Sequence, residues 1–149
     1  MSGVVSKWVV LESHAVAPGD LDAEGVLRDD VVARWVDNAR RAYLDCCSTL
    51  RDTAERDGLD IHCEIAEFPT GAQFGAPETV NVSAGATEVW PDSFRIAFRI
   101  RSFGSAGDVA FNTSCTVSLE DSTTGERAAI GDDVRDELIA LAHTARHFN

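Results

Sequence analysis

The residues best suited to chemistry in this sequence lie in one short stretch, Gly19-Asp20-Leu21-Asp22-Ala23-Glu24-Gly25-Val26, just before a long amphipathic run. A carboxylate can take up a proton or attack an electrophilic carbon. If a helix begins directly after this loop, its first free N–H groups can bind negative charge. The stretch therefore predicts a site in which a carboxylate and backbone donors meet. Gly25 is expected to give the loop the backbone shape that it needs.

A long helix is predicted after the loop, from about Asp30 to about Arg56. Its apolar residues recur at spacings of three and four, which is the pattern of a buried helical stripe: Val32, Trp35, Val36, Ala39, Tyr43 and Cys46. Asp29 and Asp30 would cap the helix or place negative charge in its first turn. Gly58 is expected to end it.

The rest of the chain predicts strands and a final helix. Strand patterns cover residues 7–13, 61–68, 79–90, 94–101, 109–120 and 126–130, and Gly85 suggests a bulge in the third of these. Phe94 to Arg101 alternates strictly between apolar and other residues, so one face should be apolar and one basic. A helix should run from Gly131-Asp132-Asp133 to near His147, with Val134, Leu138, Leu141, Ala142 and Ala145 on its apolar face. This order predicts an α+β fold, with one antiparallel sheet packed on one dominant helix in a single domain, residues 1–149.

Composition limits the partners. The net charge of −12, from 13 basic and 25 acidic residues, argues against nucleic acid and against an anionic membrane surface. No apolar run is long enough to span a membrane, and the N-terminus lacks the apolar core of a signal peptide. The four cysteines, Cys46, Cys47, Cys63 and Cys115, form no CxxC pair and are interpreted as small apolar filler in a reducing cytoplasm rather than as metal ligands.

Two segments together carry a family resemblance. Asp20-x-Asp22-Ala23-x-Gly25-Val26, followed by Arg34-Trp35-Val36-Asp37-x-Ala39-Arg40, resembles the opening of the hot-dog fold acyl-CoA thioesterases, specifically the 4-hydroxybenzoyl-CoA thioesterase-like group. The strand–helix–strands order also fits, so the resemblance covers nearly the whole chain. It implies a sheet wrapped around a long central helix and two protomers that join their sheets, as a homodimer or a dimer of dimers. Residues 79–90 and 109–120 are the expected joining surface.

The resemblance also implies roles for single residues. Asp22 would be the base or nucleophile, and the carbonyl-polarising backbone donor would lie at the helix N-terminus, near Asp29. Acyl-CoA or an acyl-carrier thioester would be the substrate, with Gly25, Val26 and Arg28 beside it and coenzyme A as the only cofactor moiety. No metal is expected.

Alternatives remain at several of these positions. Asp22 could simply cap a turn, and Asp20 is expected to be a loop hydrogen-bonding residue. Arg99 and Arg101, with Arg95, could form a solvated face or a cradle for the phosphates of coenzyme A, with Arg127 as a further candidate. The whole chain could be a non-catalytic module that binds acyl thioesters or serves as a partner subunit, or an interaction domain without an acyl ligand.

Overall fold

The computed structural model describes the backbone of residues 9–67, 70–104 and 108–147, and the side chains of these residues as far as residue 141. The elements in chain order are β1 (Val10–Ala15), η2 (Pro18–Asp20), α1 (Asp29–Asp45), α2 (Ser48–Asp57), β2 (Leu59–Ile65), η3 (Gly71–Gln73), β3 (Thr79–Trp90), β4 (Ser93–Phe103), β5 (Val109–Asp121), β6 (Arg127–Ala128) and α3 (Asp132–His147).

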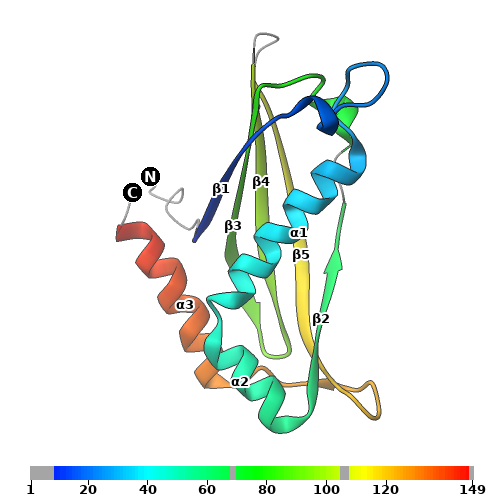
Figure 1. The fold of residues 1–149 in the computed structure, drawn as a ribbon. Coiled ribbons are helices and arrows are strands. Elements are labelled where there is room, and N and C mark those ends of the chain that lie inside the picture. Colours follow the sequence, from blue (N-terminus) through cyan, green and yellow to red (C-terminus); the bar gives the residue numbers. More distant parts are fainter. Residues whose placement is uncertain (1–8, 68–69, 105–107, 148–149) are drawn as a thin grey trace.

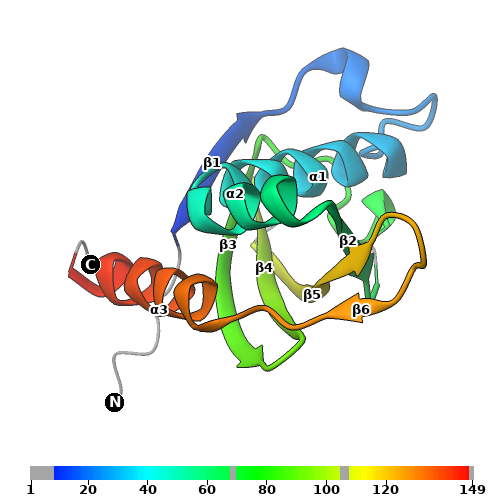
Figure 2. The same cartoon turned by 90° about the horizontal axis from the view of Figure 1, so that it is seen from below.

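One antiparallel sheet forms the body of the molecule. Its strands lie in the order β1-β3-β4-β5-β2, and the short β6 pairs with β5. α1 lies across one face of this sheet (Figure 1), and seen from below the sheet curves around it (Figure 2). α3 packs against β3 and α2. The predicted α+β class, with one sheet packed on one dominant helix, is confirmed.

The core lies between α1 and the concave face of the sheet. Val32, Trp35, Val36, Ala39 and Tyr43 of the predicted stripe are all buried. Across from them, the alternation along β4 places four apolar side chains in the core, each at most 1% exposed: Phe94, Ile96, Phe98 and Ile100. Burial of each such side chain stabilises the fold by about 1.5–3 kcal/mol, so these two patterns hold the helix on the sheet.

The predicted single helix is wrong at its middle, because the chain leaves the helical path at Cys46 and Cys47. The amide of Cys46 donates a hydrogen bond to the carbonyl of Tyr43, three residues back. Cys47 has the non-helical angles φ −96° and ψ 66°, so a new helix, α2, begins at Ser48. A carboxylate from α3 holds the new start: Glu137 accepts hydrogen bonds from the amides of Thr49 (2.9 Å) and Leu50 (3.2 Å). Cys46, predicted in the buried stripe, is exposed. Gly58 does end α2, with φ +65°.

The strand predictions differ from the structure mainly at their ends. β1 continues to Ala15, beyond the predicted 7–13, and β2 begins at Leu59 and ends at Ile65. Parts of the predicted segments, namely residues 7–8 and 68, lie outside the described residues, as do the side chains of Ala142 and Ala145. The irregularity in β3 falls between Ala86 and Glu88, next to the predicted Gly85.

The expected joining surface between protomers stays a prediction. β1 pairs only with Thr79–Ala84 of β3, and β2 pairs only with residues 115–121 of β5. Among the described residues, the part of β3 after Ala84 and the first residues of β5 therefore have β4 on one side and no strand on the other. A second copy could extend the sheet along these stretches or along the outer edges of β1 and β2, because an open edge has free N–H and C=O groups.

Candidate active site

The acidic loop closes on itself through Asp22. One oxygen of its carboxylate, Oδ1, accepts hydrogen bonds from the amides of Glu24 (2.8 Å) and Val26 (3.0 Å). Gly25 has φ +81°, a left-handed conformation that glycine adopts without strain. The Asp22 side chain is exposed, and in the described part of the chain its second oxygen, Oδ2, has no hydrogen-bond partner. Asp22 is thus both a turn-capping residue and a carboxylate with one oxygen free to act.

The loop is joined directly to the start of α1. The amide of Arg28 donates to the carbonyl of Asp20, and its guanidinium donates to the carbonyl of Gly19 at 2.9 Å. Asp20 accepts a hydrogen bond from the amide of Ala17 within the loop, as expected for a loop hydrogen-bonding residue. These bonds hold Asp22 beside the helix end.

The N-terminus of α1 has no side-chain cap. Arg28 occupies the N-cap position and its side chain makes no cap hydrogen bond, while Asp29 and Asp30 place two carboxylates in the first turn. The carboxylate of Asp30 interacts with its own backbone N–H, which contributes to its lowered pKa. No hydrogen bond among the described residues uses the amide of Asp29. This backbone donor is therefore free at the helix end.

A segment far along the sequence clamps this helix end in place. The carboxylate of Asp29 accepts a hydrogen bond from the amide of Gly71 at 2.6 Å, and the carbonyl of Gly75 accepts one from Leu27 at 2.9 Å. A Cβ atom at Gly71 would lie 1.7 Å from the carbonyl oxygen of Leu27. The two segments approach so closely that only glycine fits at this position.

Asp30 and Arg28 form an ion pair at the same helix end. Nε of Arg28 donates to the Asp30 carboxylate at 3.0 Å, and Nη2 donates to the second oxygen. This hydrogen bonding lowers the pKa of Asp30 and raises that of Arg28. The charge of Arg28, predicted as a substrate contact, is therefore already balanced by a neighbouring carboxylate.

An open depression of about 500 Å³ brings these groups together, lined by Asp22, Val26, Leu27, Arg28, Asp29, Asp30 and Ala72. Of the predicted site residues, Asp22, Val26, Arg28 and Asp29 line it, and Gly25 shapes the loop at its edge. Sequence reasoning missed Leu27 and Ala72 as lining residues, and it predicted Asp30 only as part of the first helical turn. Leu27 is adjacent to predicted residues, but no local pattern connects Ala72 with a loop some fifty residues earlier.

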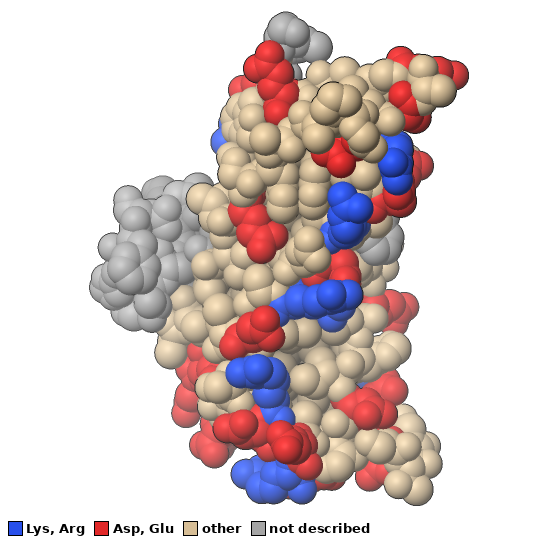
Figure 3. Space-filling model, viewed as in Figure 1, with Lys and Arg blue, Asp and Glu red and all other residues tan. Residues whose placement is uncertain are grey.

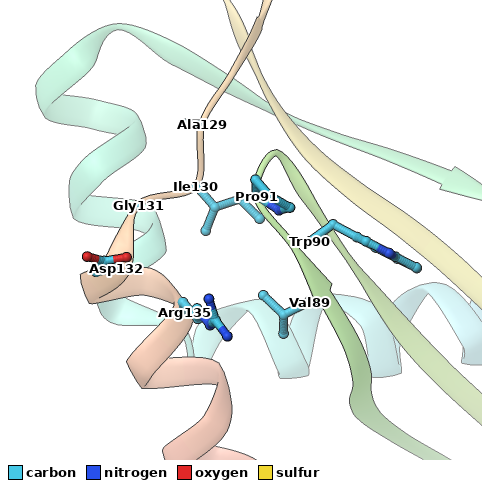
Figure 4. Close-up of a pocket in the computed structure, with 8 residues that line it drawn as sticks. All are labelled: Val89, Trp90, Pro91, Ala129, Ile130, Gly131, Asp132 and Arg135. Atoms are coloured by element: carbon cyan, nitrogen blue, oxygen red, sulfur yellow. The ribbon is translucent and has the colours of Figure 1, made fainter.

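A second cavity, of about 250 Å³, lies at the other end of β3, between the β3–β4 turn and the start of α3 (Figure 4). It is lined by Val89, Trp90, Pro91, Ala129, Ile130, Gly131, Asp132 and Arg135. None of the predicted site residues reaches it. The candidate site is therefore the depression at the start of α1.

The part of the chain that the structure describes contains no group of three His, Cys, Asp or Glu side chains placed to hold a metal ion. None of its helices is long and apolar enough to cross a membrane.

Comparison with known proteins identifies the fold through solved structures, and no similar curated sequence was found. No family model and no curated sequence matches the chain. A solved structure of an Asp-to-Asn mutant of 4-hydroxybenzoyl-CoA thioesterase, in complex with 4-hydroxybenzoyl-CoA, is similar over 87% of this chain and 97% of its own, with 15% identity and a TM-score of 0.60. A thioesterase from Thermus thermophilus, in complex with coenzyme A and zinc, is similar over 92% and 96%, with 20% identity and a TM-score of 0.63. The chain has the hot-dog fold.

A third hot-dog protein similar to this chain, the dynemicin thioesterase, covers 88% of this chain and 95% of its own, with 15% identity and a TM-score of 0.60. These three neighbours are thioesterases, and the predicted hot-dog architecture is confirmed. At these identities the likeness establishes the fold and leaves the role of each residue to be tested.

Arg99 and Arg101 lie apart from the depression in this hot-dog domain. They stand on the face of β4 opposite the buried Phe98 and Ile100, and therefore opposite α1. Arg101 lies over the ring of Phe103, and the neighbouring Arg95 pairs with Glu88 at 2.9 Å. On the α1 face, by contrast, basic and acidic side chains are intermixed (Figure 3), as in the pair of Arg41 with Asp37.

Proposed function

We propose that this chain is a thioesterase that hydrolyses an acyl-CoA or acyl-carrier thioester to a free acid and a thiol. One observation carries the proposal: the depression at the start of α1 combines the free oxygen of Asp22 with the unused amide of Asp29. The hot-dog fold and its thioesterase neighbours support the same reaction class.

The chemistry needs a group that activates water or attacks the carbonyl, and donors for the oxygen that becomes negative. Asp22 acts as base or nucleophile. The amide of Asp29 at the start of α1 donates to the carbonyl oxygen, and its position at the positive end of the helix dipole favours the developing charge. Collapse of the tetrahedral intermediate breaks the carbon–sulfur bond and releases the thiol.

Three carboxylates line the depression, and their contacts bear on whether a negatively charged oxygen can form there. Asp30 is paired with the guanidinium of Arg28, and Oδ1 of Asp29 accepts a hydrogen bond from the amide of Gly71. Among the contacts of the described residues, Asp22 and Asp29 each keep Oδ2 without a partner. Asp22 differs from Asp29 in lying in the loop and not in the first turn of the helix, and it is the residue to which we assign the role of base or nucleophile.

The proposed assembly is a homodimer or a dimer of dimers joined through β3 and β5, whose residues after Ala84 and before Cys115 have a strand on one side only in the described part of the chain. Arg99 and Arg101 are proposed to contact the phosphates of coenzyme A, which requires the ligand to extend to the outer face of the sheet. Replacing both by Gln should then raise KM more than it lowers kcat, because this contact is remote from the reacting carbonyl. A monomer by light scattering across the micromolar range contradicts the assembly, and an unchanged KM contradicts the phosphate contact.

The decisive experiment replaces Asp22 by Asn and measures hydrolysis of short, branched, aromatic and long acyl-CoAs with a thiol-detecting dye. The Asn side-chain oxygen still accepts from the amides of Glu24 and Val26, so the loop should persist and stability should change by no more than about 1 kcal/mol. Removal of the base or nucleophile should lower turnover at least about a hundredfold. Binding of acyl-CoA should survive.

Asp20→Asn is the matched control, since it removes a charge from the same loop without touching the depression, and it should lose less activity. Wild-type turnover in Asp22→Asn overturns the assigned role of Asp22. A wild type that binds acyl-CoA and hydrolyses no thioester of the panel favours the non-catalytic binding module instead. Absence of both binding and hydrolysis leaves an interaction domain as the better interpretation.

A further inference from the structure

A second cluster of reactive groups lies on the α1 face, between the middle of α1 and the edge strand β2. Cys63 of β2 is half-buried, and Nη1 of Arg40 donates to its sulfur at 3.4 Å. Nε and Nη2 of the same guanidinium bond Oδ1 of Asp37 at 3.0 and 2.6 Å. Asp37 therefore holds Arg40 in a fixed orientation, and the rest of the guanidinium faces a sulfur rather than a second carboxylate.

A second thiol adjoins Cys63 from β5. In the strand register Cys63 lies opposite Val117, and Cys115 lies opposite Ile65, so the two cysteines are diagonal neighbours on the face turned towards α1. Hydrogen bonding from Cys115 and the charge of Arg40 lower the pKa of the Cys63 thiol well below its ordinary value, although burial acts in the opposite direction. The proximity of Cys63 and burial raise the pKa of Cys115.

The sulfur of Cys63 is also within reach of small molecules. An open depression of about 470 Å³ is lined by Asp37, Arg40, Ile61, Cys63 and Ile65. The other cysteines lack this combination of access and a cation. Cys47 and Cys115 are buried, and Cys46 is exposed with its sulfur against the carbonyl of Ala42. This environment, a thiol beside a guanidinium in an accessible pocket, is typical of reactive cysteines and not of apolar filler.

We propose that Cys63 is a reactive thiolate that small hydroperoxides oxidise to a sulfenic acid. The thiolate sulfur attacks one peroxide oxygen, so that a sulfur–oxygen bond forms and the oxygen–oxygen bond breaks. The leaving hydroxide or alkoxide takes a proton from water. The sulfur is oxidised by two electrons and the peroxide is reduced by two, which balances the step.

We expect the product at Cys63 to be a sulfenic acid and not a disulfide with Cys115. Diagonal neighbours on antiparallel strands typically have Cα atoms about 7–8 Å apart, whereas a disulfide spans roughly 7 Å without backbone movement. Cys115 is buried, with its sulfur 3.9 Å from the carbonyl oxygen of Thr116, and it should remain reduced. The modification is independent of the thioesterase proposal, because no residue of the acidic loop takes part.

The first test alkylates the native protein with iodoacetamide between pH 5 and pH 9 and follows each thiol by mass spectrometry after tryptic digestion. Cleavage after arginine gives one peptide with Cys46 and Cys47 (residues 42–51), one with Cys63 (57–95) and one with Cys115 (102–127). Fragmentation of the first peptide distinguishes Cys46 from Cys47. The midpoint for Cys63 should lie at least about one pH unit below that of exposed Cys46. The charged or titratable groups around Cys63 are Arg40 and Asp37 of α1, Cys115 of β5 and His62 beside it on β2.

Two variants assign the effect to Arg40. Arg40→Leu should move the Cys63 midpoint upwards towards that of Cys46, and Arg40→Lys, which retains a positive charge, should restore much of the shift. If Arg40→Leu fails to fold, the comparison of the alkylation midpoints of Cys63 and Cys46 in the wild type still tests whether Cys63 is a reactive thiolate.

The second test adds hydrogen peroxide and a sulfenic-acid-specific dione to the native protein. The adduct should appear on the peptide of residues 57–95 and be absent in Cys63→Ser. An unreactive Cys63 in the native protein, a midpoint equal to that of Cys46, or a Cys63–Cys115 disulfide as the main product each overturns the proposal.

Discussion

The N-termini of α1 and α2 both lack a cap from their own N-cap side chain, but only the N-terminus of α2 has an acceptor from elsewhere in the protein. Neither helix is capped by the side chain of its own N-cap residue, Arg28 in α1 and Cys47 in α2. At α2, Glu137 of α3 accepts hydrogen bonds from the amides of Thr49 and Leu50. At α1, the described residues leave the amide of Asp29 without a partner, and Asp29 lines an open depression.

The difference separates a helix end that serves stability from one that can serve binding. The amides at a helix start need an acceptor, and the protein supplies one permanently at α2 through a charged side chain. At α1 the protein instead fixes the surrounding backbone, through Gly71 and Gly75, and leaves the acceptor position open. A ligand oxygen can then take the place that Glu137 fills at α2.

Gly71→Ala should have the largest effect on this comparison, because it disturbs the clamp at the open end. The added Cβ would meet the carbonyl oxygen of Leu27 at 1.7 Å, so the backbone of one segment must move. Overpacking of this kind costs about 1–3 kcal/mol or more. Urea unfolding should show this loss.

The matched control for that substitution is Gly19→Ala in the acidic loop, where an added Cβ meets nothing within 4 Å. It should leave the midpoint of unfolding nearly unchanged. Equal stability of the two variants would mean that the contact between Gly71 and Leu27 is not a constraint on the helix end.

Glu137→Ala tests the closed end and should have an intermediate effect. It removes the acceptor for the amides of Thr49 and Leu50, and loss of a helix cap costs about 1 kcal/mol. Asp136→Ala removes the same charge from the neighbouring exposed position on α3 and is the control. Thermal unfolding should distinguish the two variants, and an equal effect of both would show that charge, and not capping, is what matters.

Asp29→Asn should have the smallest effect, because the amide oxygen of Asn still accepts from Gly71. The expected loss of stability is below that of Glu137→Ala, within about 0.5 kcal/mol, since only the charge in the first turn of α1 changes. Chemical denaturation of the two variants side by side measures the difference. A loss as large as that of Glu137→Ala would mean that the charge of Asp29 is essential to the clamp.

Local patterns predicted what depends on neighbours along the chain. The alternation from Phe94 to Ile100 placed β4 and its buried face, because successive side chains of a strand point to opposite sides. The spacing from Val32 to Tyr43 placed α1 and its contact with the sheet. The two carboxylates before this run placed the acidic loop at the helix start, and Gly58 marked the end of α2, because each needs only local backbone geometry.

Local sequence patterns were enough to predict the strands, the final helix, the buried faces of α1 and β4, and the loop that carries Asp22. They did not predict that the long helix divides into α1 and α2. Tertiary structure alone decided which groups complete each site, because these partners are distant in sequence and no periodicity connects them. The amide of Gly71 reaches Asp29, Glu137 closes α2, and Arg40 meets Cys63 only when the sheet curves around α1. The break at Cys46 and Cys47 also depends on tertiary structure. The new start of α2 is held by Glu137 of α3, and no local pattern predicts this contact.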